Sequence, residues 1–138
     1  MKNWIKKMGF LVVGISLLTQ CNNSNSTSCE KTMCTMEFRM ITVSLKDSTG
    51  NDYIPDKVET YLNGTLIHYD SIPAVPAQNV YTIVDDSNLQ TLQLNVNKDV
   101  NFKVIKNGSV IKEQVFTVKA DCCHVSKVSG VDTIQIQL

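Results

Sequence analysis

The chain has 138 residues, of which 43% are hydrophobic and 19% are charged, and its formal net charge is zero. A chain of this size and balance can bury a real core and is expected to form one domain. Nucleic-acid binding calls for a strongly basic face, which this composition does not supply, so we expect no nucleic-acid partner.

The first twenty residues are typical of a removed export signal. Lys2, Lys6 and Lys7 give a positive start, and a short apolar run follows them. A membrane-spanning helix needs about 20 apolar residues, so this run is too short for a permanent span. We therefore predict a signal peptide over residues 1–20. The exported remainder would carry three more acidic than basic residues.

Residues Leu18-Thr19-Gln20-Cys21 resemble the lipobox of bacterial lipoproteins, in the relaxed form found in the Bacteroidota. The resemblance implies that Cys21 begins the mature chain and carries a lipid, which would anchor the protein in the cell envelope; we expect the outer membrane. Cleavage by an ordinary signal peptidase is the rival interpretation, but that enzyme needs small residues where Leu18 and Gln20 stand. Residues 22–28 are polar and uncharged, which predicts a flexible tether of at most about 23 Å.

Residues 29–138 show strand signals and no apolar stripe of helical period. We predict an all-β domain, a single immunoglobulin-like antiparallel β-sandwich of seven or eight strands. A closed barrel is the alternative, because the same alternation of apolar and polar residues serves both architectures. Strands are expected at 36–46, 58–62, 65–69, 80–84, 89–96, 100–106, 109–122 and 134–138.

The first predicted strand changes its inward face. Its apolar side chains lie at even positions up to Met40 and at odd positions from Ile41 onward. A strand with one fixed core face cannot do that, so we predict a β-bulge or a change of sheet between these two residues. Asn63-Gly64 and Asn107-Gly108 predict two tight hairpins, because an Asn-Gly pair supplies the positive φ angles of a type I′ turn.

Four cysteines remain once Cys21 is assigned to the lipid, and an even number in an exported chain predicts disulfides. Three connectivities are open. Alternation along the strand that ends near residue 122 puts Cys122 on the inward face and Cys123 on the outward face. The simplest pairing is then Cys34 with Cys122 inside the sandwich and Cys29 with Cys123 outside it.

Cys122-Cys123-His124 carries the alternative interpretation, a metal-handling module. Sulfur and imidazole ligands suit copper or zinc. However, alternation scatters these ligands over two faces, and the paired spacing of a zinc ribbon is missing, so we expect no cofactor. Redox catalysis through Cys122 or Cys123 is a further alternative. The methionines at 33, 36 and 40 are interpreted as strand-edge and core residues rather than as copper ligands.

His68, His124 and the pair Asp85-Asp86 are the remaining candidates for enzymatic chemistry. A lone histidine beside a strand end is more often a structural or surface residue, and adjacent acids before Ser-Asn more often belong to a solvated turn. The chain has no familiar hydrolase motif. We therefore predict a protein that is not an enzyme; an enzyme of unfamiliar type would need both histidines and the acidic pair to gather in a deep cleft.

The segments 34–43 and 121–130 resemble those of small lipoproteins of the Bacteroidota whose single domain is similar to transthyretin-like, carboxypeptidase-regulatory-like sandwiches. The Cys-Cys-His segment at 122–124 is the distinctive part. The resemblance implies a sandwich in the cell envelope and brings no catalytic residues with it. The expected function is therefore a non-enzymatic lipoprotein that binds a protein or glycan near the membrane, with loops 73–78 and 85–88 as possible contacts.

Overall fold

The computed structural model describes residue 29 and residues 32–137. The predicted signal peptide, Cys21 and the tether over residues 22–28 lie outside the described residues. Within the described part of the chain, no helix is long and apolar enough to cross a membrane.

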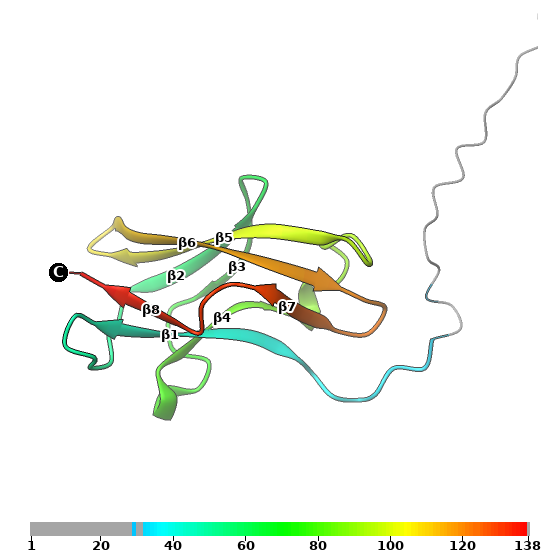
Figure 1. Cartoon of the computed structure of the whole chain (residues 1–138), viewed down its shortest axis with the longest axis horizontal. Helices are drawn as coiled ribbons and strands as arrows, with labels where there is room; N and C mark the ends of the chain where they lie inside the picture. The colour runs from blue at the N-terminus through cyan, green and yellow to red at the C-terminus, as the bar shows by residue number, and fades with distance from the viewer. Residues whose placement is uncertain (1–28, 30–31, 138) are drawn as a thin grey trace, which may run out of the picture.

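In residues 32–137, eight strands form two sheets that lie one over the other (Figure 1). The smaller sheet has the order β4-β1-β8, and the larger has the order β3-β2-β5-β6-β7. This arrangement confirms the all-β sandwich and the expected strand number. The elements are β1 (Met40–Asp47), β2 (Lys57–Leu62), β3 (Thr65–Asp70), η1 (Pro76–Gln78), β4 (Val80–Asp85), η2 (Asp86–Asn88), β5 (Asn97–Lys106), β6 (Ser109–Ala120), β7 (Val125–Ser129) and β8 (Thr133–Ile136), where η marks a short 3-10 helix.

The core lies between the two sheets and is built by alternation along the strands. On β1 the odd-numbered apolar residues from Ile41 to Leu45 are buried, as the sequence predicts. The larger sheet contributes Phe102 and Phe116, which are fully buried and pack edge to face with ring centroids 6.0 Å apart. Burial of these side chains provides the main driving force for folding.

The two predicted hairpins are confirmed. Asn63 and Gly64 adopt φ angles of 50° and 82° between β2 and β3, and Asn107 and Gly108 adopt 51° and 74° between β5 and β6. These left-handed conformations are the ones that a type I′ turn requires.

One strand pair departs from the predicted antiparallel order. β1 runs parallel to β8, with Ser44 opposite Thr133, whereas the other paired strands are antiparallel. Parallel neighbours need a long connection. Here the whole domain between the first strand and the last one serves as that connection.

One expected strand is absent from the structure, and one observed strand was not expected. Residues 89–96 form turns and a single bridge at Leu94 rather than a strand. The reason is local, because amides of this segment bond back to the Asn88 carbonyl and Asn95 adopts a positive φ of 58°. β7 was not predicted, since in its five residues only Val125 is buried.

The register of β1 against β4 shifts between Ile41 and Thr42, so a bulge exists but lies one residue later than predicted. The even-numbered residues before it are not a second inward face. β1 begins at Met40, and the side chains of Met36 and Phe38 are 104% and 59% exposed. The expectation that the methionines at 33, 36 and 40 lie at a strand edge or in the core is therefore wrong for Met33 and Met36, which precede the strand and are exposed. Met40 is the first residue of β1 and is also exposed.

Candidate functional site

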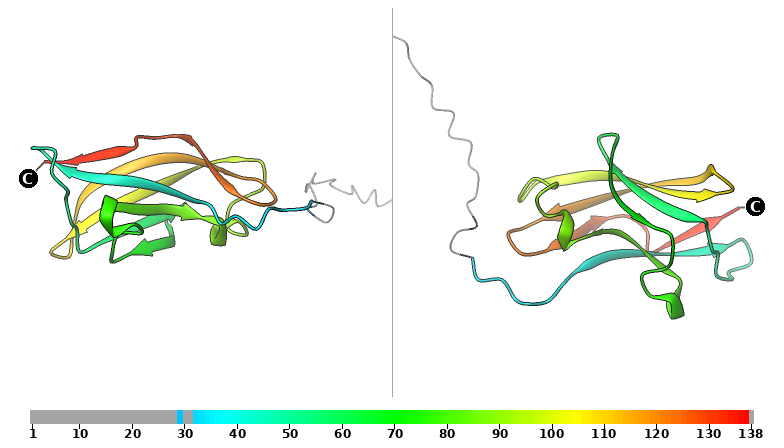
Figure 2. Two further views of the ribbon diagram at one scale, coloured as in Figure 1. Left: turned by 90° about the horizontal axis from the view of Figure 1, so that it is seen from below. Right: turned by 180° about the vertical axis from the view of Figure 1, so that it is seen from behind.

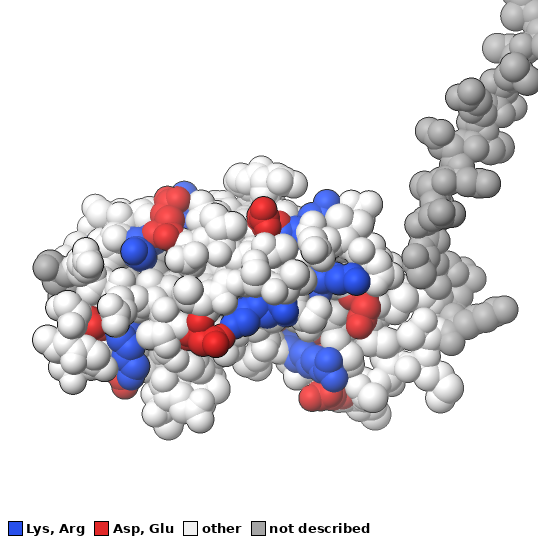
Figure 3. Space-filling model, in the orientation of Figure 1, with Lys and Arg blue, Asp and Glu red and all other residues white. Residues whose placement is uncertain are grey.

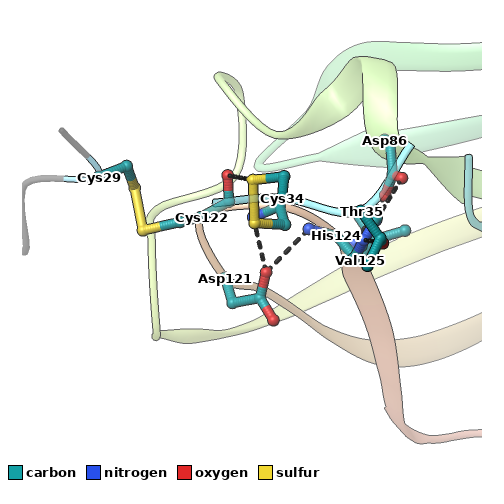
Figure 4. The surroundings of a disulfide bond; sticks show 9 residues. Cys29, Cys34, Thr35, Asp86, Asp121, Cys122, His124 and Val125 are labelled. Atoms are coloured by element: carbon teal, nitrogen blue, oxygen red, sulfur yellow. Dashed lines mark hydrogen bonds and ion pairs between the residues drawn. A yellow bond between two sulfur atoms is a disulfide. The ribbon is translucent and has the colours of Figure 1, made fainter. Parts of the chain in front are cut away.

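The segment before β1 enters the sandwich at the end where β6 turns into β7 (Figures 1 and 2). Sulfur and polar side chains gather at this end. The extended segment 32–39 lies here beside the turn 121–124, which joins β6 to β7, and close to η2. We call the side chains that join these three pieces the clamp (Figure 4). Its members are Cys29, Cys34, Thr35, Asp86, Asp121, Cys122, Cys123 and His124.

Two disulfides form the covalent part of the clamp. Cys29 bonds to Cys122 and Cys34 bonds to Cys123, with Cα atoms 5.4 and 5.3 Å apart. The prediction that these four cysteines form two disulfides is confirmed. Because such bonds persist in oxidising environments, they indicate an exported chain.

The predicted pairing of Cys34 with Cys122 and of Cys29 with Cys123 is wrong. β6 ends at Ala120, so the alternation of its faces does not extend to the two cysteines. Instead, the Asp121 carboxylate accepts hydrogen bonds from the N–H groups of Cys123 and His124, at 2.7 and 2.8 Å, and holds a turn. Both cysteines in this turn bond to the incoming segment, and neither disulfide lies in the core.

His124 is the centre of the polar part of the clamp. It is buried, and its Nδ1 lies 2.8 Å from Asp86 Oδ2 while its Nε2 lies 3.0 Å from the Thr35 hydroxyl. An ionised carboxylate only accepts hydrogen bonds, so Nδ1 carries the proton. In the neutral ring, Nε2 then accepts the hydroxyl proton of Thr35.

The Asp86 carboxylate joins three segments of the chain. Besides the imidazole, it accepts the N–H of Arg39 at the entry to β1 and the N–H of Val125 at the start of β7, each at 2.8 Å. Burial opposes ionisation of this carboxyl, but the hydrogen bonds from His124 and from the two backbone amides lower its pKa below the usual aspartate value. Asp86 is therefore a charged attachment point.

The acidic pair is not the solvated turn that the sequence suggested. The side chains of Asp85 and Asp86 are 15% and 9% exposed. Asp85 caps η2 by accepting the N–H of Ser87, and its carboxylate lies 3.8 Å from His68. His68 lies closer to Asp70, at 3.2 Å. Each aspartate of the pair thus has its own histidine neighbour, and only the Asp86 and His124 pair belongs to the clamp.

The clamp does not form the metal site of the alternative interpretation. The sulfur atoms of Cys122 and Cys123 are bonded to other sulfur atoms, so they are not available as thiolate ligands beside His124. Among the described residues, no group of three or more His, Cys, Asp or Glu side chains is placed to hold a metal ion.

Two hollows flank the clamp. One, of about 690 Å³, lies beside η2 and is lined by Asp86, Ser87 and apolar side chains of the following loop. The other, of about 450 Å³, includes Thr35, Arg39 and His124 in its wall. The predicted contact loop 85–88 therefore borders the clamp, whereas loop 73–78, with η1, lines neither hollow.

Two members of the clamp were missed by reasoning from the sequence. Asp121 carried a usable signal, because an aspartate often accepts backbone N–H groups two and three residues ahead and so starts a turn. Thr35 carried none: its role arises only because the disulfide between Cys34 and Cys123 brings it opposite His124.

The chain matches no protein-family model, and no curated protein and no solved structure is significantly similar to it. Membership of the lipoprotein family that the two segments resemble stays a prediction.

The two disulfides should stabilise the fold in a strongly non-additive way. When only one of the two bonds is present, it closes a loop of about ninety residues, worth about 4.6 kcal/mol in the loop-entropy model. Once that bond exists, the other bond closes a ring of only about eight residues, worth about 2.5 kcal/mol. Replacing one pair by serine, Cys34 with Cys123 or Cys29 with Cys122, should lower the free energy of unfolding by about 2.5 kcal/mol, and replacing all four by about 7 kcal/mol. Urea unfolding measures these losses. If the fourfold variant lost only as much free energy of unfolding as the two double variants lose in sum, the result would contradict this arrangement of the two disulfides.

Asp86→Asn should lower the free energy of unfolding by about 2 kcal/mol at pH 7, because it removes a charged acceptor from a nearly buried network. The folded-state pKa of Asp86 lies below its unfolded value. Its stabilising effect is therefore complete above about pH 4 and is lost as the pH falls through the folded pKa.

The measurement is chemical unfolding of both proteins between pH 7 and pH 2.5. The stability difference between the wild type and Asp86→Asn should shrink as the solution becomes acidic. Asp99→Asn is the control, since Asp99 is an exposed aspartate outside the clamp. This substitution should change the free energy of unfolding little. A difference that stays constant down to pH 2.5 would show that the charge of Asp86 does not stabilise the clamp.

Proposed function

We propose that this protein is a cell-envelope lipoprotein, anchored in the outer membrane through a lipid on Cys21, whose sandwich is a non-enzymatic binding or structural module. The observation that carries the proposal is the clamp. It cross-links the segment that follows the predicted tether to the far part of the chain, at Cys122 and Cys123. A domain that hangs from one lipid-bearing residue needs its attachment to be fixed firmly to the fold.

The position of the cross-links determines how a pull on the anchor reaches the domain. Without them, tension would act first on β1 and would peel its hydrogen bonds from β4 and β8. With them, tension at Cys29 passes through a covalent bond to the turn between β6 and β7. The Asp86 contacts with Arg39 and Val125 then hold β1, η2 and β7 together behind that bond.

The predicted tether also limits where the domain can act. Seven residues separate Cys21 from Cys29, so eight residue-to-residue steps join them, and a fully extended chain of that length reaches about 27 Å. The clamp end would therefore stay close to the bilayer, while loops at other parts of the sandwich face outward to a protein or glycan. The exposed 73–78 loop is the surface that we assign to such a partner. The hollow beside 85–88 borders the clamp and therefore lies at the membrane end of the domain.

Lipidation is tested by mass spectrometry of the processed protein, made in a bacterium with a lipoprotein export pathway. We expect a mature chain that begins at Cys21, carries the mass of a diacylglyceryl group and sediments with membranes. Cys21→Ser should release the chain from the membrane fraction. The variant in which serine replaces Cys29 and Cys122 is the matched control and should stay bound. An unmodified amino terminus at any other residue would refute the proposal.

A second candidate function is ester hydrolysis, which one observation favours. The Thr35 hydroxyl, the His124 imidazole and the Asp86 carboxylate are hydrogen-bonded in the order of a hydrolase triad. The carboxylate lies at Nδ1 of the imidazole and the hydroxyl lies at Nε2. The hollow beside Thr35 also contains Arg39. We rank this function second because Thr35 and Asp86 each hold the segment before β1 in place, which explains their hydrogen bonds without catalysis.

Hydrolysis of p-nitrophenyl acetate separates the two interpretations. We expect the wild type, Thr35→Val and His124→Gln to show the same background rate, because a clamp has no need of a nucleophile. A wild-type rate at least about a hundredfold above both variants would instead establish a catalytic triad, since a positioned general base contributes on this scale.

A further inference from the structure

Large apolar side chains project from the segment that enters the clamp. Met33 is 97% exposed, Met36 is 104% exposed and Phe38 is 59% exposed. Residues 32–36 contain no charged side chain. Single exposed apolar residues are common on protein surfaces, but three of this size within six positions of one segment are not. We call Met33, Met36 and Phe38 the apolar edge.

This exposure is fixed by the clamp. Cys34 is bonded to Cys123, the Thr35 hydroxyl is bonded to His124, and the Arg39 amide is bonded to Asp86. Figure 4 shows the attachments of Cys34 and Thr35. The segment therefore cannot fold its methionines back between the sheets without breaking them.

We propose that Met33, Met36 and Phe38 insert into the boundary between headgroups and acyl chains of the bilayer that holds the lipid anchor. The inference rests on the proposed function, because it takes the anchor to be at Cys21. From there the chain reaches at most about 27 Å to Cys29, so the edge cannot be far from that bilayer. Apolar side chains of surface-lying segments enter this boundary to a depth of about 5–10 Å.

The chemistry of the edge fits lipid better than a shaped protein pocket. Methionine is unbranched and flexible, so it can adapt to a fluid surface. Within residues 32–40 the one cation, Arg39, is paired with Glu37 at 3.1 Å. Lys127, which lines a hollow together with Phe38, is paired with Asp132. In Figure 3 the part of the domain next to the grey trace is mostly white. Insertion should therefore not depend on anionic lipid or on salt.

The second attachment orients the domain. A lipid on a flexible tether alone would let the sandwich tumble, whereas an inserted edge holds the clamp end against the bilayer. The turn between β1 and β2, at the other end of β1, then points away from the membrane (Figure 1). Ile54 lies in that turn region and is 65% exposed.

A tryptophan reporter tests the insertion. The sequence contains one tryptophan, Trp4, which lies in the predicted signal. The processed lipidated chain would thus have none, so Met36→Trp provides a single reporter at an exposed site. The matched control is Ile54→Trp. Each purified protein is incorporated into phosphatidylcholine vesicles with and without brominated acyl chains, at low and high salt and with and without anionic lipid. The same variants are also measured in native membranes.

We expect the Met36→Trp emission to shift to shorter wavelength and to lose most of its intensity with brominated lipid, equally at both salt concentrations, while the Ile54→Trp emission stays unchanged. If the protein binds vesicles but both tryptophans show the same emission and quenching, the insertion inference is wrong, while the proposed lipid anchor is still supported. Quenching that occurs only with anionic lipid would contradict insertion driven by apolar side chains. Protection of Met36→Trp in native membranes but not in pure lipid vesicles overturns it in favour of a protein partner. A processed chain that does not bind vesicles at all refutes the proposed function itself.

Discussion

A covalent constraint dominates this small domain: two disulfides join the segment before β1 to the turn after β6, over sequence separations of 93 and 89 residues. They bring Thr35 to His124 and hold the entry to β1 at the carboxylate of Asp86. The polar network around Asp86 depends on this proximity, because its donors come from segments that are far apart in sequence. The sulfur bonds and the hydrogen bonds thus form one unit.

The location of this unit gives it functional meaning. It lies where the chain enters the sandwich, next to the residues that would carry a lipid and a tether. Together with the proposed lipid anchor, the cross-linked base and the exposed apolar edge at this end of the domain would hold the protein near a membrane in a fixed orientation. The core between the sheets is packed around Phe102 and Phe116 and continues to this end through Ile41 and Val125.

The fold was predictable from the sequence where local chemistry decides it. The Asn-Gly turns and the alternation of Ile41, Val43 and Leu45 specified hairpins and an inward face without tertiary information. The strand predicted at residues 89–96 is absent, because alternation of apolar and polar residues alone cannot show that Asn95 takes a left-handed conformation. The parallel contact of β1 with β8 is set by long-range packing, for which no short motif exists.

The candidate site was predictable only in part. The number and redox state of the cysteines followed from parity and export, but their pairing failed because strand alternation was extended beyond Ala120 into a turn. Asp86 looked like a solvent-exposed turn residue, since nothing near it in sequence shows that Arg39, His124 and Val125 converge on it. Met36 and Phe38 looked like core residues because their exposure is a consequence of the clamp.

Disulfide mapping tests the clamp most directly. The processed protein would be digested without reductant, and the linked peptides fragmented by electron transfer so that the backbone breaks between residues 122 and 123. The structure predicts links of Cys29 to Cys122 and of Cys34 to Cys123, with no free thiol among these four. The crossed pairing, a bond between the two adjacent cysteines, or four thiols that react without reduction would contradict it.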